Sequence, residues 1–386
     1  MKKSIHIFAV MTLCLALFAQ EPSHDVAVIN IEVPVRVFKG SKFVDSLTIN
    51  DFEVYEDGKL QKIEAVYLIK KTNIESEETV LEKKEARKKF APEVSRNFVL
   101  MFEITDYLPK IKEALEYFFE NVITPGDTLM VVTPVKSYKF NKKALEIAPR
   151  HEIAKRLNEK LRKDITMGSR DFKKLIRDCE DIFLFDFPMD LKLSLLKDKI
   201  REIKNLRYLD EKKLQDFADF LKNMNGQKYA FLFYQKVLIP YPKLPPESLE
   251  YLELTSELTS LYSIDVEKVR QAYADSSISI HFLYITNTKE RDPDKGRLRP
   301  TGLEMHDISM DIFSTFREIS LATGGTVDSS ANAAASFEKV VNASENYYLI
   351  YYAPKNYKAD GKFKEIKVKV KNKNYRITHR AGYLAD

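Results

Sequence analysis

The five residues Phe98-Val99-Leu100-Met101-Phe102 are all apolar, which is typical of a short strand buried on both faces of a parallel sheet. Apolar residues then recur at helical spacing from Ile111 to Val122, and Pro125-Gly126-Asp127 ends that helix. Strand and helix keep alternating until Gly324-Gly325 closes a last long helix. These repeated units predict an α/β domain with a doubly wound, mainly parallel sheet. The further strands expected on this pattern are residues 129–132, 229–233 and 278–285.

Both ends of the chain show the two-residue period of β-strands instead. Apolar and polar residues alternate from Val28 to Phe38 and again from Ile366 to Val370, and Asp57-Gly58 is a strong hairpin-turn signal. Each end segment is near the lower limit of roughly 40 residues for independent folding. We therefore expect residues 24–70 and 345–386 to form one discontinuous β-sandwich. The regions between them are a charged linker or solvated helix at 71–95 and the inserted α/β domain at 96–344.

The composition is that of a globular protein. Of 386 residues, 44% are hydrophobic and 31% are charged, which argues against a disordered chain. The formal net charge of +5 is a small excess of 62 basic over 57 acidic side chains, too small and too mixed to indicate nucleic-acid binding. A length of 386 residues predicts two domains.

The N-terminus has the form of an export signal. Lys2 and Lys3 precede an apolar run from Ile5 to Phe18, and polar residues follow Ala19. This predicts a signal peptide at residues 1–19 and an exported product. A membrane anchor is the alternative, but the run is too short to cross a hydrocarbon core of roughly 30 Å comfortably. No membrane span is expected after cleavage. Cys179 is then the one remaining cysteine, and we expect it to be a buried, small apolar group.

Several phrases in the sequence carry a family resemblance. Leu47 to Gln61 contains a "DFxVxEDGxxQ" phrase, Ala322-Thr323-Gly324-Gly325 follows the last long helix, and the chain closes on Arg380-Ala381-Gly382-Tyr383. In order and spacing, these resemble the bacterial, acidobacterial-type family of secreted VWFA-related proteins. The resemblance implies that residues 96–344 are a von Willebrand factor A-like domain. It also implies a periplasmic or extracellular location in the bacterial envelope.

Domains of that type typically bind Mg²⁺ through an Asp-x-Ser-x-Ser loop, a threonine and a later aspartate, since the ion needs several oxygen ligands. Here the first loop is Glu103-Ile104-Thr105-Asp106-Tyr107, and the later position is Tyr234-Gln235-Lys236, without a carboxylate. Thr166 or Ser169 match the second loop only loosely. The resemblance therefore implies a degenerate metal-ion-dependent adhesion site. Its vestigial positions are Glu103, Thr105, Tyr107 and Gln235, and we expect no metal and no other cofactor.

Catalytic patterns are weak in this sequence. Its six histidines form no pair at metal-ligand spacing, and the chain has no HExxH motif and no Gly-rich phosphate loop. We therefore expect a protein-binding module that is not an enzyme and that binds its partner without metal. The alternatives are a metal-dependent adhesion module that uses Glu103, Thr105 and Asp106 in an altered site and, third, a hydrolytic enzyme.

A partner is expected to bind where the parallel strands end. Ligands of open α/β sheets collect at the carboxyl ends of the strands, where loops can vary without disturbing the core. Tyr107, Tyr234 and Tyr241 are expected at that edge. Tyrosine is common among residues that dominate binding energy, because it buries a large ring and keeps a hydroxyl for hydrogen bonding. These three tyrosines are the predicted contacts for a protein partner whose identity the sequence does not specify.

Overall fold

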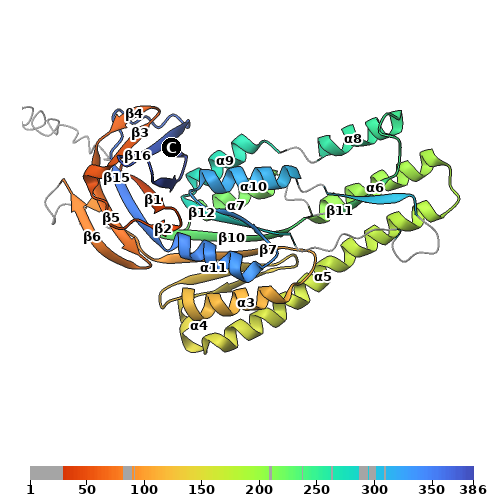
Figure 1. Ribbon diagram of the computed structural model, residues 1–386, viewed down its shortest axis with the longest axis horizontal. Helices are drawn as coiled ribbons and strands as arrows, with labels where there is room; N and C mark the ends of the chain where they lie inside the picture. Colours follow the sequence, from red (N-terminus) through yellow and green to blue (C-terminus); the bar gives the residue numbers. More distant parts are fainter. Residues whose placement is uncertain are drawn as a thin grey trace, which may run out of the picture.

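The computed structural model describes residues 29–80, 89–90, 92–207, 211–236, 238–261, 264–286, 294, 301–307 and 310–386. The predicted signal peptide, residues 1–19, lies outside the described residues. Within them, four sheets and a set of helices are arranged as an elongated molecule (Figure 1).

The first sheet combines strands from both ends of the chain. Its strands are β1 (Ile31–Lys39), β2 (Lys42–Phe43), β5 (Ile63–Lys70), β6 (Asn73–Thr79), β15 (Asn346–Tyr352) and β17 (Arg376–His379). The order is β17-β1-β15-β5-β6, with β2 also paired to β1, and every pairing is antiparallel. In this register Val33 of β1 lies opposite Ile350, and Val37 lies opposite Ile377. The N-terminal strand β1 therefore has C-terminal strands on both sides.

A second antiparallel sheet packs against the first. Its strands are β3 (Phe52–Glu56), which directly follows the 3-10 turn η1 (Ile49–Asp51), β4 (Lys59–Gln61), β16 (Phe363–Val370) and β18 (Gly382–Leu384). Their order in the sheet is β18-β16-β3-β4. Val54 and Ile366 of this sheet share one hydrophobic cluster with Val35 and Ile350 of the first. The two sheets therefore form a sandwich with a common core, at the left of Figure 1.

The hairpin turn between β3 and β4 forms where the sequence predicts it. Asp57 and Gly58 have φ angles of 47° and 77°, and Glu56 pairs with Lys59 across the two-residue loop. Positive φ at both central positions gives the backbone twist that matches the flanking strands, which is why Asp-Gly is favoured there.

A mixed sheet forms the centre of the molecule. Its strands, in the order β14-β12-β10-β7-β8-β9, are β7 (Arg96–Glu103), β8 (Thr128–Val132), β9 (Ser137–Phe140), β10 (Gln227–Gln235), β12 (Ile278–Ile285) and β14 (Val327–Ser330). Four of its pairings are parallel, and β9 pairs antiparallel with β8 at one edge. Alternate residues of β7 face opposite clusters, since Leu100 packs with Ile111 whereas Val99 packs with Val269.

Helices cover both faces of the mixed sheet. One face carries α3 (Pro109–Tyr117), the π-helical turn η2 (Phe118–Val122), α4 (Lys142–Ile147), the first half of α5 (Arg150–Leu184) and α11 (Ala333–Ser344). The other carries α7 (Glu211–Lys222), α9 (Val266–Asp275) and α10 (Met310–Ala322), with the second half of α5 and α6 (Met189–Arg207).

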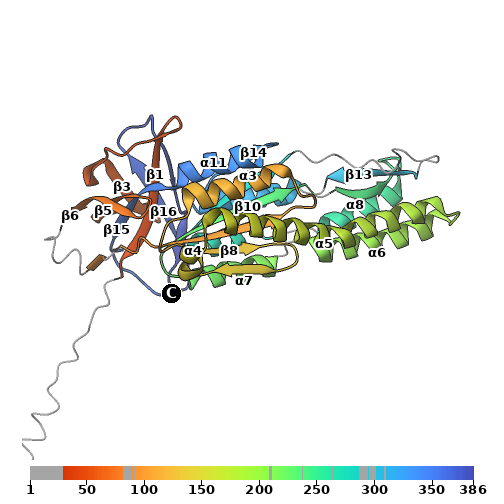
Figure 2. The same ribbon diagram turned by 90° about the horizontal axis from the view of Figure 1, so that it is seen from below.

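The long helix α5 continues beyond the sheet. Together with α6 it makes a helical hairpin that points away from the sandwich, and both views show this arrangement (Figure 1, Figure 2). The elements beside the hairpin are α8 (Leu249–Leu261) and a two-stranded antiparallel sheet of β11 (Leu238–Pro242) and β13 (Leu303–Asp307).

The predicted fold class, a doubly wound, mainly parallel von Willebrand factor A-like sheet inserted into a small β-sandwich, is wrong for this chain. Ten of the fourteen strand pairings among the described residues are antiparallel, and three of the four sheets contain no parallel pair. The strands predicted at 98–102, 129–132, 229–233 and 278–285 do form and pair in parallel, but they belong to a mixed sheet with an antiparallel edge strand. A two-residue period or a buried apolar run shows that a strand exists, but not which direction its neighbour takes.

The predicted charged linker contains regular structure. Residues 73–79 form strand β6, which pairs along β5 with Thr79 opposite Ala65, and Phe90 is buried against the first sheet. Outward-facing Glu and Ser side chains make β6 a charged edge strand, so its sequence shows no apolar alternation. In the part of the chain that the structure describes, no helix is both long and apolar enough for a membrane crossing.

Candidate functional site

The carboxyl ends of the paired strands β7 and β10 lie side by side. Tyr234 pairs with Glu103, the last residue of β7, and Gln235 is the last residue of β10. The amide of Gln235 is fully buried and holds the turn after β7. Its Oε1 accepts hydrogen bonds from the backbone N–H groups of Thr105 and Asp106, both at 2.9 Å, and from Thr105 Oγ1 at 3.1 Å. Its Nε2 donates to the Asp106 carbonyl oxygen at 3.1 Å.

The long helix α5 completes this arrangement. Lys173 Nζ donates to Asp106 Oδ1 at 2.7 Å, and Ser169 Oγ donates to the Thr105 carbonyl oxygen. Thr166, the other candidate from the sequence, is exposed and donates to the Arg162 carbonyl oxygen of its own helix at 2.8 Å. The expected second loop is therefore a helix face, because residues 150–184 form one continuous helix.

These residues do not fit a divalent cation. Mg²⁺ or Ca²⁺ needs several oxygens, carboxylates above all, directed at one point. The Gln235 oxygen already accepts three hydrogen bonds, and Lys173 supplies a positive charge to the Asp106 carboxylate. Among the described residues, no cluster of three His, Cys, Asp or Glu side chains is arranged to hold a metal.

Tyr107 is the one predicted partner contact that stays partly exposed. Its hydroxyl donates to Asn158 Oδ1, and its ring lies 5.9 Å from the Arg162 guanidinium. Burial raises the pKa of the Tyr107 hydroxyl. Part of the ring is accessible, but contacts with α5 hold it in place, so it lies on the side of that helix.

Tyr234 and Tyr241 are not surface contacts, and their assignment to a partner-binding surface does not match their burial. Tyr234 is 3% exposed and packs among Phe282, Tyr284 and Phe316. Tyr241 is 5% exposed. Both belong to strands that the second halves of α5 and α6 cover, and the sequence pattern does not show how far those helices extend.

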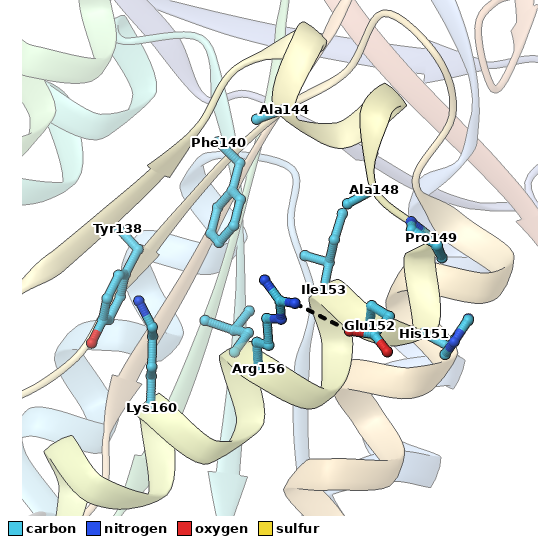
Figure 3. Close-up of a pocket in the computed structure, with 11 residues that line it drawn as sticks. Tyr138, Phe140, Ala144, Ala148, Pro149, His151, Glu152, Ile153, Arg156 and Lys160 are labelled. Atoms are coloured by element: carbon cyan, nitrogen blue, oxygen red, sulfur yellow. Dashed lines mark ion pairs between the residues drawn. The ribbon is translucent and has the colours of Figure 1, made fainter.

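A separate groove lies at the edge of the mixed sheet. It has a volume of about 530 Å³ and is formed by β9, α4 and the first turns of α5 (Figure 3). The side chains of Phe140, Ile153 and Leu157 supply its apolar surface, together with Tyr138. The strand β9 is the edge strand of the sheet, so no further strand covers this side among the described residues.

Charged side chains border the apolar part of the groove. Arg156 lies 3.5 Å from Glu152, and Lys160 lies 5.3 Å from the centre of the Tyr138 ring. Figure 3 shows Arg156 and Lys160 rising from α5 on the same side as Phe140. Two cations against one carboxylate leave the rim positive.

The Tyr138 ring is fixed from below by a buried carboxylate. Its hydroxyl donates to Asp164 Oδ2 at 2.8 Å, and Thr133 Oγ1 donates to the same oxygen at 3.0 Å. Asp164 is 2% exposed. Burial, followed by the hydrogen bond to Asp164, raises the pKa of the Tyr138 hydroxyl. The Tyr138 ring is therefore already fixed before a ligand binds. Little side-chain conformational entropy is lost from this part of the groove on binding.

The sequence contains only a weak signal for this groove. Tyr138 and Phe140 alternate on a four-residue strand, and residues 150–174 are a basic amphipathic helix that is typical of an ordinary solvated surface. The groove is lined by residues of β9, α4 and the first turns of α5, and their relative placement depends on the tertiary packing.

No protein-family model matches the chain, and no curated protein matches it in sequence. Among solved structures, the crystal structure of the human COPII-coat protein Sec24c is similar over 76% of this chain, at 7% sequence identity and a TM-score of 0.34. The chain spans 44% of that chain. A similarity at this score supports no conclusion on fold or function.

Proposed function

We propose that the protein is an exported, non-enzymatic binding module that uses the groove between β9 and α5 to hold aromatic side chains of an acidic segment in a partner protein, without a metal ion. The observation that carries this proposal is the combination of an apolar, aromatic groove with a cationic rim on one edge of the sheet.

The groove has suitable chemistry for such a segment. Its volume of about 530 Å³ is within the range of roughly 300–1,000 Å³ that is typical of ligand sites, and its surface is largely aromatic and aliphatic. An inserted aromatic ring would be removed from water against Phe140 and Tyr138, and aromatic pairs add about 0.5–1.5 kcal/mol beyond the buried area. Acidic neighbours of that ring would face Arg156 and Lys160, which favours acidic segments over basic ones.

Metal-independent binding is supported by the contacts at the carboxyl edge. Because Thr105 Oγ1 already donates to Gln235 Oε1 and Asp106 Oδ1 accepts from Lys173 Nζ, a metal at these oxygens would have to displace a hydrogen bond and a cation. This disfavours the alternative of a metal-dependent adhesion module at Glu103, Thr105 and Asp106. A cysteine nucleophile at Cys179 is disfavoured, because its thiol is completely buried and burial raises its pKa to about 12.

A bacterial envelope location and membership of the VWFA-related family belong to the same proposal. They rest on the apolar run at residues 5–18 and on the phrases at 47–61, 322–325 and 380–383.

The test uses a fluorescent synthetic peptide in which aspartates alternate with two phenylalanines. We expect Arg156→Glu/Lys160→Glu to weaken its binding at least tenfold, about 1.4 kcal/mol, as measured by fluorescence anisotropy. The matched control is Lys155→Glu/Lys163→Glu, the same change in net charge on exposed residues of the same helix outside the groove. It should change the affinity less than threefold, because long-range electrostatics are equal in the two variants.

Two further measurements complete this test. Replacing both phenylalanines of the peptide by serine should abolish binding, and EDTA or millimolar Mg²⁺ should leave the affinity unchanged. Equal weakening by the two charge-reversed variants would overturn the groove as the binding site. Loss of binding in EDTA would favour the metal-dependent alternative.

A further inference from the structure

The turn between α5 and α6 carries five of the sixteen exposed large apolar side chains among the residues that the structure describes. We call residues 184–191 the tip. Each of its eight residues is exposed, and its large apolar side chains, with their exposed fractions, are Leu184 (42%), Phe185 (60%), Phe187 (40%), Met189 (49%) and Leu191 (42%). The rings of Phe185 and Phe187 lie 5.7 Å apart. Contiguous exposed apolar side chains of this kind mark an interaction site more often than a solvated surface.

The tip is also acidic. Asp186 and Asp190 of the tip are exposed, as is Asp181 one turn earlier on α5, and none of the three forms an ion pair with any residue that the structure describes. Asp186 and Asp190 lie between or beside the aromatic rings, in the run Phe185-Asp186-Phe187-Pro188-Met189-Asp190. Two rings flanked by carboxylates are the chemistry that the groove accepts.

We infer that the tip of one copy of this chain docks in the groove of a second copy, with Phe185 and Phe187 against Phe140 and Tyr138. This inference rests on the proposed function and names its partner. The aspartates of the tip would then face the cations of the rim, Arg156 and Lys160.

Geometry excludes docking within one chain. The groove is at the start of α5 and the tip is at its end, and the 31 residue steps from Ile153 to Leu184 rise about 46 Å at 1.5 Å per step. Figure 1 shows the two places at opposite ends of the helix. A rigid helix cannot bring its own end back to its beginning, so a tip can reach only the groove of another copy.

The contact joins two different surfaces, and this has a consequence for assembly. When a tip fills a groove, the pair closes as a two-fold dimer if the second tip reaches the second groove, and otherwise association continues until a ring closes or an open filament grows. The inference therefore predicts self-association that rises with concentration and needs both surfaces.

A lipid surface is the competing occupant of an exposed aromatic tip. The three aspartates oppose it, because bacterial and other anionic membranes repel carboxylates at the point of contact. The positive rim of the groove attracts these carboxylates, whereas an anionic membrane repels them, and we therefore assign the tip to the groove.

Sedimentation velocity of the mature chain over a wide concentration range tests the inference. The wild-type protein should form concentration-dependent oligomers. The tip variant Phe185→Ser/Phe187→Ser and the groove variant Arg156→Glu/Lys160→Glu should each remain monomeric. A mixture of the two should form heterodimers and nothing larger, because only the tip of one and the groove of the other are intact. The control Leu321→Ser removes an exposed leucine, 50% exposed, from α10 and should assemble like the wild type.

Each remaining outcome contradicts the inference. If the wild type stayed monomeric at all concentrations, or if both double variants still formed oligomers, a second copy of the chain would not be the partner of the groove. Flotation of the wild type with vesicles of phosphatidylglycerol and phosphatidylethanolamine, lost in the tip variant and without self-association, would assign the tip to lipid. In all these cases the peptide-binding test decides the proposed function separately, since the tip variant keeps an intact groove.

Discussion

Lys228 is a buried cation near the start of β10, close to the charged groups of Arg380 and Glu32 in the sandwich. It is 6% exposed, and its Nζ donates to the Ser276 carbonyl oxygen at 2.8 Å. Burial, and then the nearby positive charge of Arg380, lower the pKa of the Lys228 ammonium from 10.5 to about 8. A lowered pKa means that the charged form is less stable in the folded protein than in the unfolded chain.

The sign of the pH dependence follows from that shift. Below pH 8 the lysine is protonated in both states, and its burial destabilises the fold by the full amount. Between pH 8 and 10.5 the unfolded chain binds more protons than the folded protein, so the free energy of unfolding rises with pH. We expect the wild type to gain stability from pH 7.5 to 9.5 relative to Lys228→Met.

Urea unfolding at several pH values measures this difference. At pH 7 the Lys228→Met protein should be more stable by about 1–2 kcal/mol, since the unfavourable charge is removed while the Ser276 carbonyl oxygen loses a donor. Other titrating groups cancel in the comparison because both proteins contain them. Parallel pH curves for the two proteins would show that Lys228 has an ordinary pKa.

The small sheet of β11 and β13 depends on the packing of one face. A two-stranded sheet is marginally stable by itself in water. Here Ile239 and Leu303 are fully buried, and the Tyr241 ring stacks on His306 with the ring centres 4.5 Å apart. The Tyr241 hydroxyl also shares a hydrogen bond of 2.8 Å with Thr255 Oγ1 on α8. Tyr241 therefore joins β11 to both β13 and α8.

Substitutions at Tyr241 should affect stability and not partner capture. Tyr241→Ala should lower the free energy of unfolding by about 3–5 kcal/mol, the range for deleting a large buried ring. Tyr241→Phe removes only the hydrogen bond to Thr255 and should lower it by about 1 kcal/mol. Chemical denaturation measures both values. If Tyr241→Ala left the free energy of unfolding unchanged and weakened partner binding, Tyr241 would be a binding residue, as the sequence predicts.

At the scale of the whole molecule, the sandwich requires both ends of the chain. Residues 345–386 supply β15 and β17, which flank β1, and β16 and β18, which complete the second sheet. Two buried arginines connect the sandwich to the central sheet. Arg36 donates to the Gly324 carbonyl oxygen at 3.2 Å and to Ser279 Oγ at 3.2 Å, and Arg380 donates to Ser277 Oγ, just before β12, at 2.5 Å.

Deleting residues 345–386 should leave β1 paired only with the two-residue strand β2. The apolar faces around Val33 and Val35 would be exposed, and unpaired strand edges of this kind promote aggregation. We expect the shortened protein to aggregate or to lose protease resistance within residues 29–80, as limited proteolysis followed by mass spectrometry would show. A soluble, cooperatively unfolding protein that is protected in that segment would mean that the two ends do not share a core.

Part of this structure could be predicted from local patterns. The apolar run at 98–102, the Asp57-Gly58 turn and the helical period from Ile111 onward are confirmed as elements. The candidate site could be predicted only in part. The sequence shows that residue 235 is a glutamine and not a carboxylate, but it does not show that Gln235 forms hydrogen bonds with Thr105 and Asp106. The groove could not be predicted from the sequence. Its lining residues come from β9, α4 and α5, and no local pattern in these elements shows how far apart they lie in the folded chain.

The sequence by itself determined several of the strands, turns and helices, such as the strand at 98–102 and the Asp57-Gly58 turn, because periodicity and turn chemistry act over a few neighbouring residues. Only the tertiary structure decided that most strands pair antiparallel, that Tyr234 and Tyr241 are buried while the tip at 184–191 is exposed, and that α4 and α5 leave a groove beside β9. Strand direction, burial and cavities depend on contacts between residues that are distant in the chain. A local pattern is compatible with several such contacts, and the packing of the whole molecule selects one of them.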